Sequence, residues 1–209
     1  VAVLGLGYGM GAKKFQTTLA LGAMGPAMNI TASEASRIVK LYRSKNNKIP
    51  LAWKEADQLL YRMLRKETGT AFNGVIEFDE LTIWLPNGMG IHYPGLHVSE
   101  HDAIKYNANG VYKHVYGGLV VENITQALAR IIVGEQAIEI DDKLRALKLR
   151  KGEVAATCML THDEDVTCVP ERLADKWLKT QIECMQKPRA WCPTLPVDAD
   201  GGFDRCYSK

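Results

Sequence analysis

Residues 154–169 read Val-Ala-Ala-Thr-Cys-Met-Leu-Thr-His-Asp-Glu-Asp-Val-Thr-Cys-Val, with an apolar run on each side of an acidic stretch. The apolar runs at 154–160 and 166–169 are typical of short strands, and the charged residues between them are typical of a turn. The pattern therefore predicts a strand, an acidic turn and a second strand. Acidic turns are often only solvated, so Asp163 and Glu164 are open to two interpretations, a metal site and a plain surface loop.

Helices are expected on both sides of this hairpin. Leucine, valine and isoleucine at helical spacing predict a long helix over residues 117–140. After the hairpin, Pro170 is suited to the first turn of a final helix that ends near residue 185.

The first part of the chain is also expected to be helical. Thr-Ala-Ser-Glu at 31–34 fits a capping box and predicts a helix over about 32–45. Pro50 separates that helix from a second one, expected over 51–66.

The pattern changes near residue 75. Short β-prone segments at 75–78 and 81–85 precede a Pro-Asn-Gly turn signal. We therefore expect a helical part over 1–75, followed by a part over 76–209 with an antiparallel sheet and packed helices. The predicted fold class is α/β of the α+β type.

The composition excludes several classes of protein. The chain has 209 residues, 46% hydrophobic and 24% charged, with a net charge of +2 that does not reveal a partner. It contains no apolar run of about 18 to 20 residues and no secretory signal at residues 1–11, so a cytoplasmic protein without a membrane span is expected. Five cysteines without a Cys-x-x-Cys pair argue against a disulfide framework and a thiolate zinc site.

Alternate glycines at 5, 7, 9 and 11 invite comparison with a dinucleotide-binding loop. A Rossmann unit needs a helix, a second strand and an acidic ribose ligand about 20 residues later, whereas the first acid here is Glu34, within an expected helix. A Walker loop is excluded because no Gly-Lys-Ser/Thr occurs. A nucleotide-binding oxidoreductase remains an alternative.

The same segment can be read as a helix. Leu4 and Tyr8 would then share one face, and the glycines beside them would let a base pair approach the backbone. Each interior glycine costs about 1 kcal/mol of helix stability relative to alanine, so this many glycines require a reason.

Read in this way, residues 4–10, Leu-Gly-Leu-Gly-Tyr-Gly-Met, resemble the end of motif B of family A (DNA polymerase I-like) DNA polymerases. Thr-His-Asp-Glu at 161–164 resembles motif C, the palm hairpin that binds catalytic metal. Three further stretches resemble phage-type members of the family in the same order: 32–53, 85–94 and 116–130. The resemblance covers most of the chain and implies a C-terminal portion of such a polymerase.

The resemblance implies a fingers portion over 1–75, which starts inside the motif B helix, and a palm portion over 76–209. It implies an enzyme for DNA replication that uses dNTPs and primer-template DNA with two Mg²⁺ (or Mn²⁺) ions, in a bacterial or phage-infected cell. Asp163 would be a metal ligand, Glu164 an auxiliary carboxylate, and His162 would shape the turn. An N-terminal exonuclease domain would be compatible with the full-length protein.

Other residues take roles from the same resemblance. The nucleotide and templating base would lie against Leu4, Gly5, Tyr8 and Gly9. Minor-groove contacts would come from Gln126 and, with a spacing one residue shorter than usual, Asn123. Template phosphates would meet Lys13 and Lys14, although a solvated helix face is an equally good interpretation of these two lysines.

The chain also departs from the family pattern. Met89 stands where relatives carry arginine, and Leu4 stands where an aromatic residue is common. No match to motif A, which supplies the other metal-binding aspartate, occurs, so the chain alone is expected to be inactive and to leave an unpaired strand edge beside motif C. A non-catalytic DNA-binding module is the third interpretation.

Overall fold

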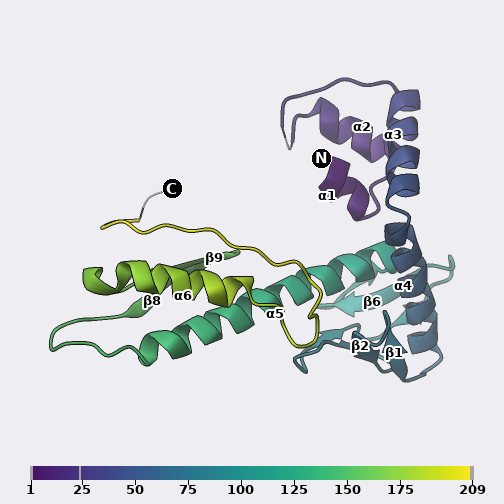
Figure 1. The fold of residues 1–209 in the computed structure, drawn as a ribbon. Helices are drawn as coiled ribbons and strands as arrows, with labels where there is room; N and C mark the ends of the chain where they lie inside the picture. Colours follow the sequence, from purple (N-terminus) through teal and green to yellow (C-terminus); the bar gives the residue numbers. More distant parts are fainter. Residues whose placement is uncertain (1, 24, 208–209) are drawn as a thin grey trace. The chain divides into compact units, whose positions relative to one another are not determined.

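The computed structural model describes residues 2–23 and 25–207, and the side chains of residues 2 and 4 lie outside the described part. It contains helices and antiparallel sheets, so the predicted α+β fold class is confirmed (Figure 1). The chain divides into two compact units, Val1–Ala127 and Leu128–Lys209. The boundary that the sequence indicated near residue 75, between the expected helical part and the expected part with a sheet, stays a prediction.

Four helices begin the first unit. They are α1 (Ala2–Gly7), α2 (Ala12–Ala20), α3 (Ala32–Lys45) and α4 (Lys48–Leu64). The predicted helix over 32–45 is confirmed together with its capping box, because the Glu34 N–H donates to Thr31 Oγ1 at 3.2 Å and the Thr31 N–H donates to Glu34 Oε2 at 2.8 Å. Two orphan amides of the first turn are thereby satisfied locally.

A small apolar core joins α1, α2 and α3. Its fully buried members are Leu6, Phe15, Ala35 and Val39. Each helix presents only one buried stripe, so the three short helices stabilise one another rather than standing alone.

Helix α4 begins three residues earlier than predicted, at Lys48 instead of residue 51. Pro50 was expected to precede the helix, but it lies in the first turn. A first-turn residue needs no N–H donor, and the fixed φ of proline is already helical, so Pro50 is compatible with this position.

Two antiparallel sheets follow α4. The first has the order β1 (Gly69–Ala71), β2 (Ile76–Phe78), β3 (Thr82–Trp84), β4 (Gly90–His92). The second has the order β5 (His97–Val98), β6 (Ile104–Ala108), β7 (Val111–His114). The β-prone segments at 75–78 and 81–85 are confirmed as strands, and His92, His97 and His114 also lie in strands.

Helix α5 (Gly117–Arg145) ends five residues later than predicted, and the division between the two units falls within it. Two acid-to-base pairs at i, i+4 support its last turns, Asp141 with Arg145 at 2.7 Å and Glu139 with Lys143 at 3.6 Å. The charged stretch after residue 140 therefore extends the helix instead of ending it.

The start of α5 is fastened to α4. The Gly117 N–H donates to Asp57 Oδ1 at 2.5 Å, so a carboxylate of α4 satisfies an orphan amide at the N-terminus of α5. Helix α5 has no acidic residue of its own in its first turn. Gly117 is buried against α4, and because it has no side chain the two helices can approach closely there.

The second unit contains the predicted hairpin, β8 (Ala156–Thr161) and β9 (Glu164–Cys168). The turn η1 (Glu171–Leu173) and helix α6 (Ala174–Gln186) follow, which confirms the final helix after Pro170. The unit has its own buried core of Ile140, Leu144, Trp177 and Cys184.

Both hairpin strands pair only with each other within the described residues. All sheets of the described part are antiparallel, so they contain no parallel βαβ unit of the kind that the oxidoreductase alternative requires. No helix in that part of the chain is both long and apolar enough to cross a membrane.

Candidate functional site

The acidic hairpin turn is shorter than the sequence indicated. Thr161 pairs with Glu164, so the connection has only two residues, His162 and Asp163. His162 has φ +54°, the left-handed conformation that a two-residue hairpin loop demands. Its predicted role in shaping the turn therefore has a conformational basis. Asp163 is exposed at the tip, where its carboxylate is available to a cation.

Glu164 is the first residue of β9 rather than part of the turn, and it is half-buried. The Tyr207 hydroxyl lies 3.1 Å from Oε1 and 3.2 Å from Oε2 of Glu164, so it donates to the carboxylate. Tyr207 is remote in sequence, and no pattern around it pointed to this contact.

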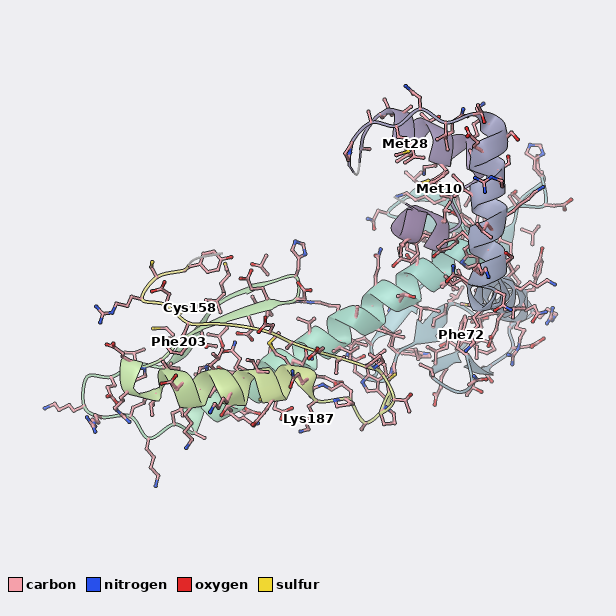
Figure 2. All side chains as sticks on the ribbon, turned by 45° about the horizontal axis from the view of Figure 1, so that its top comes forward. Met10, Met28, Phe72, Cys158, Lys187 and Phe203 are labelled. Carbon is pink, nitrogen blue, oxygen red and sulfur yellow. The ribbon has the colours of Figure 1, made fainter. Side chains whose placement is uncertain are left out.

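The C-terminal tail brings Tyr207 to the hairpin. It leaves α6 at Lys187, turns and passes back along α6 to Phe203 (Figure 2). Gln186 Nε2 donates to Asp198 Oδ1 at 2.8 Å, and Arg205 lies 3.3 Å from Glu171. The tail is thus attached to the second unit at several points before it reaches Glu164.

Asp165, the next acidic residue after Glu164, is not a solvated neighbour of the turn. Both of its carboxylate oxygens are buried and accept no hydrogen bond within the described structure. Burial, and secondarily the charge of Asp141, raises the pKa of Asp165. Thr167, two residues further along β9, accepts a hydrogen bond from Trp177 Nε1 and donates one to Gln181. Both partners belong to α6, so this side of β9 faces α6.

The residues at the turn fit a hard divalent cation in kind. Carboxylate oxygens are the ligands that Mg²⁺ prefers, and Asp163 and Glu164 supply two carboxylates at one turn. Within the described part of the chain, however, no group of three His, Cys, Asp or Glu residues is placed to hold a metal. A complete two-metal site would need further ligands.

The glycine-rich segment is helical only as far as Gly7. The Met10 N–H donates to Gly5 O at 3.0 Å and the Gly9 N–H donates to Leu6 O at 3.4 Å, while Gly9 has φ +86°. These are the two bonds and the left-handed residue of a Schellman motif, which ends a helix. Gly9 is therefore required by the backbone, independently of any ligand.

The predicted nucleotide-facing residues have different outcomes. The side chain of Leu4 lies outside the described residues. Tyr8, which was expected on the helix face of Leu4, caps the end of α1 and is half-buried. A β-carbon at Gly5 would lie 2.8 Å from Met10 Cε, so the Met10 side chain of the same segment occupies the space beside Gly5.

Tyr8 lies close to the first turn of α5, since a β-carbon at Gly118 would be 3.9 Å from the Tyr8 carbonyl oxygen. Farther along α5, Asn123 Nδ2 donates to the Tyr93 hydroxyl at 3.1 Å, so this amide has a structural partner. Gln126 is exposed and its amide lies 3.3 Å from Glu122 Oε1. Of the two predicted minor-groove residues, only Gln126 presents an exposed amide.

Lys13 and Lys14 are exposed in the first turn of α2. No acidic residue accompanies them there, so two positive charges stand at the positive end of the helix dipole. Together with Gly11 and Thr17 they line a shallow, open hollow. This surface is compatible with an anion and equally with a solvated helix face.

The chain is similar along its whole length to part of a phage protein. It is 29% identical over 227 aligned residues to a DNA polymerase of Bacillus phage SP02, and the aligned region covers 100% of this chain and 32% of that protein. The chain thus spans about one third of the length of this relative. No protein-family model matches the chain, and no solved structure matches it.

Proposed function

We propose that this chain is the C-terminal fingers and palm portion of a family A DNA polymerase and takes part in nucleotide transfer from dNTPs to a primer 3′ end. The single observation that carries the proposal is the whole-length similarity to a phage DNA polymerase. The hairpin with an exposed aspartate at its two-residue turn agrees with the motif C resemblance.

The chemistry requires charge neutralisation more than covalent assistance. When bound, two divalent ions activate the primer hydroxyl and offset the charge of the leaving pyrophosphate. Asp163 would hold a metal directly, and Glu164 would add an auxiliary carboxylate whose orientation Tyr207 restrains. The remaining aspartate, that of motif A, would come from a part of the polymerase that this chain does not contain.

Recognition of the nascent base pair would come from the first unit. Tyr8 would lie near the templating base, with Leu4, Gly5 and Gly9 beside the nucleotide. Gln126 would donate to minor-groove acceptors that every correct pair presents, whereas the Asn123 amide would have to leave Tyr93 to do so. Lys13 and Lys14 would meet template phosphates.

The proposal is tested by Asp163→Asn in a polymerase that contains the whole of this chain. The variant keeps the size of the side chain and loses its charge, so primer extension with Mg²⁺ should fall by at least about a thousandfold, a barrier increase of about 4 kcal/mol. Binding of primer-template should persist, because no groove contact is removed.

The matched control is Asp102→Asn. Asp102 is also exposed in a tight turn, with φ +55°, but it lies in the first unit between β5 and β6. Extension by this variant should equal that of the parent. Extension within about tenfold of the parent by Asp163→Asn would remove Asp163 from the catalytic site.

A non-catalytic DNA-binding module remains the second candidate. This candidate needs no metal ligands, whereas the polymerase needs further ligands besides those among the described residues. Binding of primer-template without metal-dependent extension in the longer protein would select this candidate.

A further inference from the structure

Three exposed aromatic residues lie along β7 and just beyond its end. Tyr112, His114 and Tyr116 occupy alternate positions and are all exposed, Tyr112 by 55% and Tyr116 by 43%. Val115 between them is 1% exposed. Because successive side chains of a strand point to opposite faces, Tyr112 and His114 lie on one face of β7; the Tyr116 ring, just beyond the strand, lies 5.4 Å from the His114 ring.

The strand register extends this face across the sheet. His97 of β5 pairs with Lys105 of β6, and Lys105 pairs with His114 of β7. Directly paired residues share a face, so the three form a row across all strands, about 10 Å long at the usual strand spacing. Asn107 opposite Tyr112 belongs to the same face.

The opposite face of this sheet is packed around Ile104 and Tyr106 of β6, whereas Val98 and Val111 on its outer strands are exposed. Ile104 is buried there, and the Tyr106 ring lies edge-on to the buried Tyr93 at 5.1 Å between ring centroids. The centre of that face is therefore fixed against apolar neighbours, while the face of Lys105 carries polar and aromatic groups outward.

The outward rings are held in defined positions. His97 Nδ1 lies 2.8 Å from the Gly95 carbonyl oxygen, so the ring N–H donates to it. The His97 ring is perpendicular to the Tyr112 ring at 4.9 Å, and the His114 ring lies tilted against the Tyr116 ring at 5.4 Å. Two aromatic pairs thus flank Lys105 with little rotational freedom left to lose on binding.

The charge of this face is one-sided. On this face the strands β5, β6 and β7, all of whose residues are described, present Lys105, His97 and His114 and no acidic residue. Lys105 makes no ion pair within the described part of the chain. The nearest acids in sequence, Glu100 and Asp102, lie in the loop between β5 and β6.

We propose that this face, defined by His97, Lys105, Tyr112, His114 and Tyr116, binds a single-stranded nucleic acid. Its bases stack on the two tyrosines, and its phosphates lie along the row from His97 through Lys105 to His114. The choice of nucleic acid as partner rests on the proposed polymerase function. An unpaired template strand is the source of such a ligand in that reaction.

The chemistry favours a single strand over a duplex. Stacking on a protein ring needs a base whose own face is free, and a duplex buries those faces in its stack. A face with exposed tyrosines on a sheet and positive charge between them combines the two contacts by which single strands are held without sequence preference.

The test measures binding of labelled oligothymidine, and of a blunt duplex of equal length, to the whole chain by fluorescence anisotropy. Tyr112→Ala and Tyr116→Ala should each weaken oligothymidine binding by about tenfold and leave duplex binding unchanged. Tyr112→Phe keeps the ring and should stay within about twofold of the parent. Tyr61→Ala, at a 49% exposed tyrosine of α4, is the matched control and should change neither affinity.

Unchanged oligothymidine binding in the Tyr112→Ala, Tyr116→Ala double variant would overturn the inference. So would a concentration-dependent oligomer of the parent that the double variant abolishes, because the face would then be a protein interface. If duplex binding by the chain and Asp163-dependent extension by the longer polymerase persist in either case, only this inference fails. A parent chain that binds neither probe would contradict the proposed function as well.

Discussion

Gly117→Ala tests the helix contact that positions the start of α5. A β-carbon at Gly117 would overlap the Trp53 carbonyl oxygen and lie 2.8 Å from Asp57 Cγ and 2.9 Å from Asp57 N. Two of these neighbours are backbone atoms of α4, which cannot rotate away. The helices must therefore separate by roughly 1 Å at this point, against a close-packed interior.

The expected cost combines two losses and one gain. Overpacking of this kind costs about 1–3 kcal/mol, and the stretched bond from the Gly117 N–H to Asp57 forfeits about 1 kcal/mol. Replacing glycine by alanine in a helix returns up to about 1 kcal/mol. We expect a net loss of about 1–3 kcal/mol, which lowers the melting temperature of a chain of this size by about 2–12 °C.

Thermal and urea unfolding followed by circular dichroism measure the loss, and hydrogen exchange of α4 and the start of α5 locates it. Gly118→Ala is the matched control. A β-carbon there would lie 3.0 Å from Cε2 of the Tyr116 ring, which is a side chain rather than backbone and needs to shift by only a few tenths of an ångström. This variant should remain within about 0.5 kcal/mol of the parent.

A Gly117→Ala variant as stable as the Gly118→Ala variant would refute the reasoning. It would mean that α4 and α5 are not in contact through the Trp53 carbonyl and Asp57. The capping of α5 by Asp57 would then have to be abandoned as well.

Two further outcomes concern single residues. Gly9→Ala should lower the free energy of unfolding in urea by about 1–2 kcal/mol, because φ at Gly9 is +86°. Gly134→Ala, equally uncrowded but inside α5, should raise it by about 0.5–1 kcal/mol. Equal effects of the two substitutions would exclude the Schellman turn. Arg172, and then the Arg150 N–H, lower the pKa of Glu153 from 4.5 to about 2. The stability from this carboxylate is present above pH 4.5 and is lost as the pH falls toward 2, so the melting temperature of Glu153→Gln should fall less than that of the parent over that range; parallel curves would contradict the pair.

Local signals in the sequence determined much of the secondary structure. The capping box at 31–34 predicted α3 with its observed bounds, because its two hydrogen bonds join residues three positions apart. The acidic hairpin was also predicted, since alternating strand residues and a charged turn are short-range features. The end of α5 was missed because charged residues usually mark a helix end, and here they form i, i+4 pairs.

The candidate site depended on contacts that sequence spacing does not reveal. Asp57 caps a helix that begins 60 residues later, and Tyr207 reaches Glu164 from 43 residues away. Asp165 lies within β9 on the side of Thr167, which contacts α6, whereas Asp163 lies in the turn, so one carboxylate is buried and the other exposed. Likewise, His97, Lys105 and His114 form one row only through strand register. Backbone hydrogen bonds between residues close in sequence can be predicted from local sequence patterns. Burial and charge at the residues of the site depend instead on which distant elements pack against them, and only the tertiary structure decides that packing.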